Sequence, residues 1–199
     1  MTEPPKIKGV AIREFFGWYV SRFGADYVQA RIARLPERVR GQLDVDHPYL
    51  GILDSEWYPA ELVHQLLDSA ARGMSPDERA QLMRDGARAA LSATLRGVYR
   101  LLFETMMTPE RYLRRAQALF SRYFDTGTIT KIAESRNSHL THIHNWSSHH
   151  PLLCDFVQYT AETVYGAMGC RSVESARLSC VSTGGALCSF RVTWALGRK

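Results

Sequence analysis

The chain has 199 residues, 45% hydrophobic and 23% charged, which suits a single globular domain over residues 1–199 with a substantial core. No apolar run reaches the roughly 20 residues of a membrane-spanning helix, and the N-terminus lacks the features of a signal peptide, so we expect a cytoplasmic protein with no membrane partner. The formal net charge of +5 comes mostly from arginines that are interleaved with acids, which indicates a solvated surface and argues against a nucleic-acid partner.

The first two thirds of the chain carry apolar residues at helical spacing, interrupted by glycine and proline. Gly24 follows the first predicted helix as its C-terminal cap, and Pro36 ends the second. Ser75 and Glu78 have the spacing of a capping box, which predicts the start of a long helix rich in small residues. Residues 41–55 fit a connection or a short strand. The predicted helices cover residues 12–23, 25–35, 59–72, 76–106 and 108–124.

The last third of the chain alternates hairpin and helix patterns. Arg136 and Asn137 separate two strand-like segments, and Gly184 and Gly185 separate two more, since paired glycines allow the positive φ of a tight turn. This order predicts an α+β fold in which helices pack on one face of an antiparallel sheet of about four strands. The predicted strands cover residues 128–133, 138–146, 176–182 and 187–195, with a helix over residues 151–168.

All four cysteines lie in the last quarter of the chain, and three of them, Cys154, Cys180 and Cys188, are candidate metal ligands. The second hairpin could bring two thiols together, and the preceding helix could supply the third. Zinc prefers four sulfur or nitrogen ligands in a tetrahedron, and His149 or His150 could complete such a set. The spacing matches none of the short zinc signatures, and three buried thiols without metal are the alternative.

A family resemblance rests on Tyr165–Gly169 and on the segment from Cys180 through the paired glycines to Phe190. These residues resemble the end of 4-vinyl-reductase-like domains, which share a fold with haem–nitric-oxide-binding domains and with TRAPP vesicle-tethering subunits. Five further segments resemble a paralogous family abundant in myxobacteria that has no settled activity: Arg13–Phe16, Ser21–Gly24, Trp57–Pro59, Gly97–Arg100 and Arg122–Gly127. The resemblance implies a ligand-sensing or scaffolding domain rather than a catalyst.

The resemblance also bears on cofactors. In phenol-sensing 4-vinyl-reductase-like domains, zinc is held by three cysteines and a glutamate, and the three cysteines above fall on those positions. Arg177 stands where the glutamate is expected, so the fourth ligand is unknown and would have to be Glu174, His149 or His150. The haem branch holds its iron through a histidine on a helix that corresponds to Tyr112–Asp125. That segment contains no histidine, so we expect no haem, with zinc as the one candidate cofactor.

Two other groups of residues are candidate sites. His142 and His144 share one face of a predicted strand, which fits either a metal pair or, as we favour, the solvent face of an edge strand. A set of aromatic residues recurs at element ends and could line an apolar small-molecule pocket, although ordinary core packing is the alternative. These pocket candidates are Trp57, Tyr58, Tyr99, Phe103, Tyr123 and Phe124.

Enzyme signatures are absent: the sequence has no phosphate-binding glycine-lysine loop, nucleophile elbow or H-E-x-x-H motif, and it offers no catalytic residues. We therefore expect a non-enzymatic domain that binds an unknown small molecule and gives the input to a signalling protein by changing conformation. A homodimer or a regulatory protein partner would transmit that change. The main alternative is a TRAPP-like interaction scaffold with a filled cavity, and an enzyme of tetrapyrrole metabolism comes third.

Overall fold

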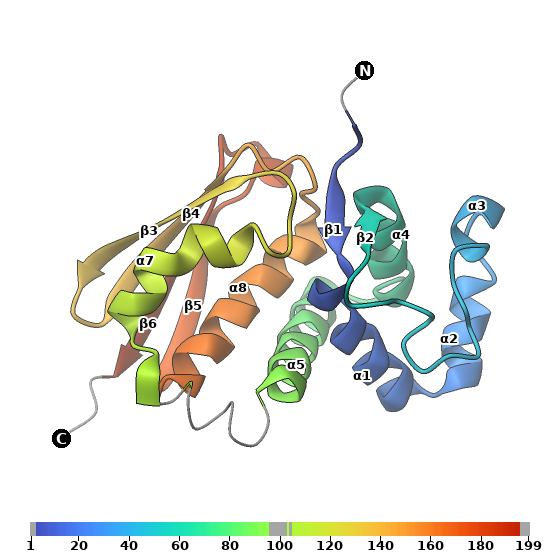
Figure 1. Ribbon diagram of the computed structural model, residues 1–199, viewed down its shortest axis with the longest axis horizontal. Coiled ribbons are helices and arrows are strands. Elements are labelled where there is room, and N and C mark those ends of the chain that lie inside the picture. The colour runs from blue at the N-terminus through green and yellow to red at the C-terminus, as the bar shows by residue number, and fades with distance from the viewer. Residues whose placement is uncertain (1–2, 96–102, 104, 196–199) are drawn as a thin grey trace.

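The computed structural model of the chain describes residues 3–95, 103 and 105–195 (Figure 1). Its helices are α1 (Arg13–Phe23), α2 (Ala25–Ile32), α3 (Glu37–Arg40), α4 (Ala60–Ala70), α5 (Pro76–Thr94), α7 (Pro109–Phe120) and α8 (Pro151–Ala167). Its strands are β1 (Lys6–Lys8), β2 (Trp57–Pro59), β3 (Thr128–Ser135), β4 (Ser138–His144), β5 (Arg171–Ser179) and β6 (Cys188–Ala195). Among the described residues no helix is both long and apolar enough to span a membrane.

The larger sheet is antiparallel and has the strand order β3-β4-β6-β5. Alternate residues of β4 point inward, so His139, Thr141 and Ile143 are buried while their neighbours are half-exposed. Helices α7 and α8 lie against the sheet (Figure 1), α7 over β3 and α8 over β5 and β6. This arrangement confirms the predicted α+β fold with a four-stranded antiparallel sheet.

The remaining helices pack behind α8, which lies between the sheet and α5 (Figure 1). The capping box at the start of α5 forms as predicted: Ser75 Oγ accepts from the Glu78 amide, and Glu78 Oε2 accepts from the Ser75 amide at 2.7 Å. Gly86 lets α1 approach α5 closely, because a Cβ there would lie 2.3 Å from the ring of Phe15. Small residues in α5 therefore serve helix packing at this point.

A second, two-stranded sheet joins the N-terminus to the middle of the chain. β1 pairs antiparallel with β2, with Ile7 opposite Tyr58, and Ile7 is completely buried. From the sequence we predicted that a short strand in this region would lie within residues 41–55 and that Pro59 would be the first residue of a helix. Pro59 instead ends β2 and caps α4, because the backbone there pairs with a segment about 50 residues away in sequence.

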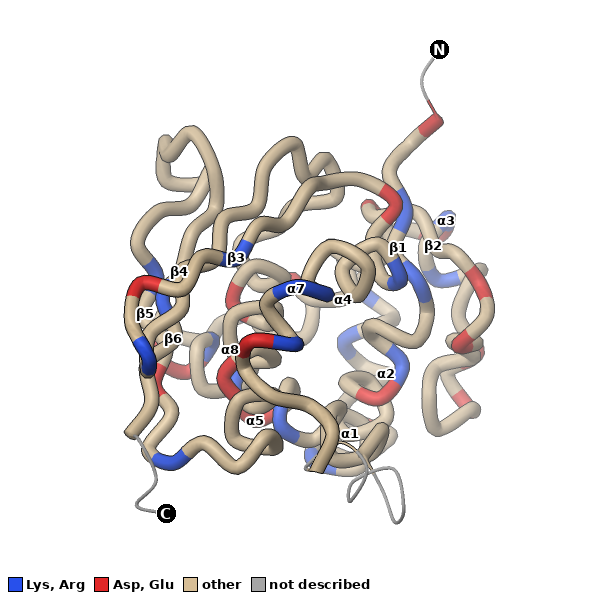
Figure 2. Tube along the Cα trace, turned by 60° about the vertical axis from the view of Figure 1, so that its left-hand side comes forward, with Lys and Arg blue, Asp and Glu red and all other residues tan. Residues whose placement is uncertain are grey.

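Several other boundaries differ from the predicted ones. Helix α5 ends at Thr94 rather than near residue 106. After Pro36 the chain forms the short helix α3, which the sequence did not indicate. Strand β5 begins at Arg171, five residues early, because β6 offers it a pairing partner as far as Ala195. Basic and acidic residues are interspersed along the chain trace (Figure 2), as the sequence indicated.

Candidate functional site

A cavity of about 140 Å³ lies where α5, α7 and α8 meet the inner face of β3. Small side chains on the helices leave this space, since Ala87 and Ala90 come from α5 and Ala116 from α7. Larger apolar groups close the rest of the wall. Among them are Phe120, Phe124, Ile129 and Phe156. The result is a mostly apolar cavity, open on one side to solvent, between the helical layer and the sheet, a common form of small-molecule site.

Only some of the predicted pocket residues line this cavity. Tyr123 and Phe124 line the cavity, whereas Phe103 borders a separate hollow beside Met106 and Met107. Trp57 and Tyr58 are not among the cavity-lining residues and lie on β2, where Tyr58 Oη accepts a hydrogen bond from the Leu53 amide at 2.9 Å. Tyr99 lies outside the described residues.

Lys131 is a cavity residue that sequence reasoning missed. It follows Ile129 by two positions on β3, so strand alternation turns both side chains inward. Only 8% of Lys131 is exposed, and its Nζ donates to Thr141 Oγ1 at 2.8 Å. Burial lowers the pKa of Lys131 to about 7. The signal that could have found it is a lone lysine at an inward position of a predicted strand.

Beside Lys131 lies a buried polar contact between the sheet and α8. His139 Nδ1 lies 2.5 Å from Tyr165 Oη, and the Trp194 ring packs against both. Burial, followed by the charge of Lys131, lowers the pKa of His139, and burial raises the pKa of Tyr165. Both groups are therefore held neutral near pH 7.

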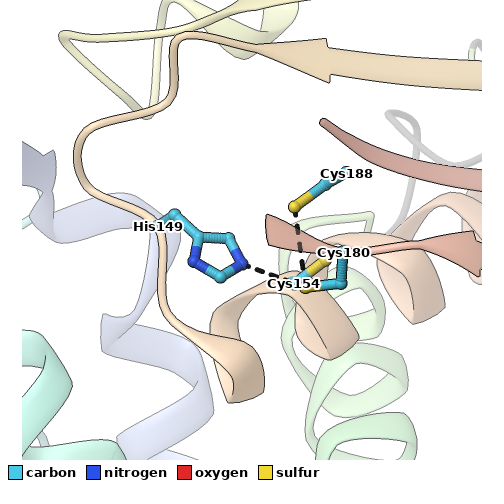
Figure 3. Close-up of side chains that lie close together, drawn as sticks. All are labelled: His149, Cys154, Cys180 and Cys188. Atoms are coloured by element: carbon cyan, nitrogen blue, oxygen red, sulfur yellow. Dashed lines mark hydrogen bonds between the residues drawn. The ribbon is translucent and has the colours of Figure 1, made fainter. Parts of the chain in front are cut away.

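The three cysteines converge at the opposite end of the sheet together with His149 (Figure 3). Cys154 lies in the first turn of α8, Cys180 directly follows β5, and Cys188 begins β6. His149 comes from the loop that leads into α8. One ligand atom from each of the four residues lies within 4.8 Å of the others. We refer to these four residues as the cysteine cluster.

The spacing within the cysteine cluster suits a four-coordinate metal ion. Cys180 Sγ lies 3.7 Å from Cys188 Sγ and 3.3 Å from His149 Nε2. A tetrahedral ion with bonds of about 2.3 Å holds its sulfur ligands about 3.8 Å apart. Burial lowers the pKa of His149 to about 4, which keeps the imidazole neutral, and raises the pKa of Cys154.

Arg177, at the position where the family resemblance implied a glutamate, forms an ion pair with Asp155 of α8. The positive charge of Arg177 is thus partly neutralised beside the thiols.

His142 and His144 face the half-exposed outer side of β4, with ring centroids 6.0 Å apart. The prediction that these histidines lie on an edge strand is wrong, because β4 lies between β3 and β6, and the edge strands of this sheet are β3 and β5.

No family model matches this chain, and no curated protein matches it. Solved structures do resemble it. An Fe(II) unliganded H-NOX protein from K. algicida is similar with a TM-score of 0.67 and 14% identity, over 96% of this chain and 98% of that one. The chain has the H-NOX fold. An oxygen-binding H-NOX domain related to soluble guanylate cyclases agrees, with a TM-score of 0.61 and 10% identity over 94% of this chain and 95% of that one.

A third structure, described as probing the function of heme distortion in the H-NOX family, has a TM-score of 0.65 and 11% identity over 97% of this chain and 99% of that one. The relation to haem–nitric-oxide-binding domains is thus confirmed at the level of the fold. The expectation that haem is excluded is contradicted, because these structural relatives are haem proteins. The cysteine cluster by itself gives only weak support for zinc.

The cavity fits haem only in part. None of the seven histidines of the chain is among the lining residues, whereas Tyr112 and Tyr123 are. Tyrosine is one of the residues that hold haem iron in proteins. The apolar walls suit the porphyrin, but a cavity of about 140 Å³ is close in size to one that takes a single benzene ring, so α5 and α7 would have to move apart.

Proposed function

We propose that the chain is a non-enzymatic ligand-sensing domain whose cavity between α5, α7, α8 and β3 binds a small apolar molecule. The observation that carries this proposal is the cavity itself, which combines apolar walls with a few buried polar groups. Such a combination is typical of small-molecule sites. The H-NOX fold supports the proposal, since the neighbour described as oxygen-binding is a ligand-binding domain of that fold.

Binding would act through the helices. Because α5, α7 and α8 surround the cavity, an occupant that fills it would fix their spacing, and we propose that a homodimer or a regulatory partner reads this change. The alternative, an interaction scaffold whose interior is filled by its own side chains, is less well supported, since small residues leave the space open.

Filling the cavity tests the proposal. Ala116→Phe places a ring in the space, whereas Ala118→Phe puts the same ring on the exposed face of α7. With benzyl alcohol as a neutral ring-sized probe, we expect Ala116→Phe to weaken binding by more than about tenfold and Ala118→Phe to leave it unchanged, as measured by calorimetry. Equal binding by both variants would contradict the assignment of this cavity.

Haem is a second candidate occupant, favoured by the structural relatives. Haem would supply an iron that binds a diatomic gas, and Tyr112 or Tyr123 would be the residue to hold it. Addition of haemin to the purified chain tests this directly. A Soret band that shifts in Tyr112→Phe or Tyr123→Phe would identify the ligand, and free haemin absorption alone would exclude haem.

The cysteine cluster, on our proposal, holds a metal ion with Cys154, Cys180 and Cys188 as thiolate ligands and His149 as the fourth. Support comes from the compact grouping of the four ligand atoms and from the 3.7 Å sulfur–sulfur distance. A site with four protein ligands has no open position, so its role would be structural. The metal ion would link the start of α8 to the end of β5 and the start of β6.

A further inference from the structure

Lys131 lies on the cavity wall with 8% of its surface exposed. An ammonium group has three N–H donors. Among the described residues only one acceptor, Thr141 Oγ1, is within hydrogen-bond distance. Thr141 lies directly opposite Lys131 in the β3–β4 pairing and is itself completely buried. Most of the hydrogen-bonding capacity of Lys131 is therefore unused.

Aromatic rings, rather than an anion, surround this amine. Its Nζ lies 4.9 Å from the ring centroid of Tyr112, 5.6 Å from that of Tyr165 and 5.5 Å from that of Phe190. In the part of the chain that the structure describes, no carboxylate forms an ion pair with Lys131. Cation–π contacts offset only part of the cost of burying a charge.

The titratable groups nearby do not supply a negative charge either. Burial raises the pKa of Tyr112 on α7 and of Tyr165 on α8, so both phenols stay neutral. Burial and then the charge of Lys131 lower the pKa of His139 on β4, and the Glu110 carboxylate acts on that histidine in the opposite sense. Lys131 is thus a buried amine without a protein counter-ion among the described groups, and its ammonium form is only partly populated near pH 7.

A second polar atom on the wall also lacks a partner. Thr160 lies on α8 and lines the same cavity, and its buried Oγ1 has no hydrogen-bond partner among the described residues. Buried polar groups are ordinarily satisfied, and the lining of this cavity holds both an underused amine, at Lys131, and an unpaired hydroxyl, at Thr160.

We propose that the cavity selects a ring-sized apolar molecule that carries one carboxylate, and that the carboxylate binds Lys131. The inference rests on the proposed function and names its ligand class. The size follows from the volume: a cavity of about 150 Å³ takes a benzene ring, and this one measures about 140 Å³. The charge follows from Lys131, because a hydrogen-bonded ion pair stabilises both groups where water is excluded.

Proton uptake would accompany binding. Burial alone lowers the pKa of Lys131 to about 7, so part of the amine is neutral at pH 7.5. A bound carboxylate favours the ammonium form, and the complex takes up a proton from the buffer. The heat of binding then depends on the ionisation enthalpy of the buffer.

Calorimetry with two probes tests the charge requirement. Benzoate carries the carboxylate, and benzyl alcohol is a neutral ring of similar size. Lys131→Met removes the charge while keeping a long apolar side chain, and Lys8→Met is the matched control, because Lys8 does not line the cavity. We expect Lys131→Met to weaken benzoate binding about 10- to 100-fold, to abolish proton uptake and to leave benzyl alcohol within about threefold. We expect Lys8→Met to change neither.

The outcomes separate the two proposals. If wild type and Lys131→Met bind both probes equally, the carboxylate assignment is overturned and the ligand-binding function stands. If wild type binds neither probe and is indistinguishable from Ala116→Phe, both proposals fail. Thermal unfolding of Lys131→Met shows that the variant folds, and a melting temperature at or above that of wild type is expected, since an unpaired buried charge is removed.

Discussion

At the residue scale, Glu134 and Arg191 show how a single ion pair is placed by the sheet. Glu134 lies on β3 and Arg191 on β6, and the pair spans β4 on the outer face. Arg191 Nε and Nη2 donate to the two carboxylate oxygens at 2.6 and 2.8 Å, and Ser138 Oγ donates to one of them. These side-chain hydrogen bonds connect β3, β4 and β6, in addition to the backbone pairing of the strands.

This pair predicts a pH dependence of stability. The hydrogen bond from Arg191, followed by that from Ser138, lowers the pKa of Glu134 from 4.5 to about 2. Because the folded-state pKa is depressed, the stabilisation is complete above about pH 4.5 and is lost as the pH falls through about 2. We expect Glu134→Gln to lower the free energy of unfolding at pH 7, and the difference from wild type to shrink toward pH 3 in urea titrations.

Glu174→Gln is the control for that experiment. Glu174 is exposed on β5 and forms no ion pair among the described residues. An equal loss of stability in Glu174→Gln and Glu134→Gln, or a difference that does not change with pH, would show that the Arg191 pair is unimportant.

Lys131 and His149 show what limits sequence reasoning about single residues. The alternation of β3 determines that Lys131 faces inward, yet its lack of a counter-ion depends on α7, α8 and β4, which are distant in sequence. His149 and His150 are adjacent and chemically equal in the sequence. The turn before α8 places His149 beside the thiols, while His150 pairs with Asp68 of α4.

At the element scale, α5 combines close packing with an open wall. Gly86 faces α1, where the Phe15 ring fills the space that a side chain would need, and Ala87 and Ala90 face the cavity. The small residues of this helix therefore serve two purposes: Gly86 permits close helix packing, and Ala87 and Ala90 leave space for the cavity.

Two glycine substitutions separate packing from helix propensity. In Gly86→Ala the new Cβ would lie 2.3 Å from the buried Phe15 ring, so we expect a loss of about 1–3 kcal/mol in the free energy of unfolding. In Gly166→Ala on α8 nothing lies within 4 Å of the new Cβ, and we expect a gain of about 0.5–1 kcal/mol. Chemical denaturation measures both values, and a stabilising Gly86→Ala would contradict the close packing of α1 on α5.

At the scale of the whole molecule, the cysteine cluster and the cavity share α8. The helix begins at the cluster and, within the two turns after Cys154, contributes Phe156 and Thr160 to the cavity wall. A metal ion in the cluster would fix the start of this helix against β5 and β6. The proposed metal site would then preorganise the cavity as well as stabilise the fold.

Metal loading tests this link. With Co²⁺ as a spectroscopic probe, we expect wild type to show thiolate-to-metal absorption at one ion per chain. At an ion concentration about 1,000 times Kd, binding would stabilise the fold by about 4 kcal/mol and raise the melting temperature by roughly 10 °C. A chelator should reverse both effects.

Cys188→Ser and His149→Ala should lose the Co²⁺ signal or shift it, whereas His144→Ala, on the outer face of β4, should not. An unchanged absorption spectrum in Cys188→Ser, or no uptake by wild type, would show that the cluster is three buried thiols beside an imidazole.

The sequence by itself determined the fold class, the capping box of α5 and the approximate positions of the four strands of the large sheet, since local periodicity and turn residues carry these features. It also grouped the three cysteines near one hairpin. Only the tertiary structure decided the pairing of β1 with β2, the position of the cavity and the isolation of Lys131. Each of these depends on contacts between residues far apart in sequence, where local patterns carry no signal about which surfaces meet.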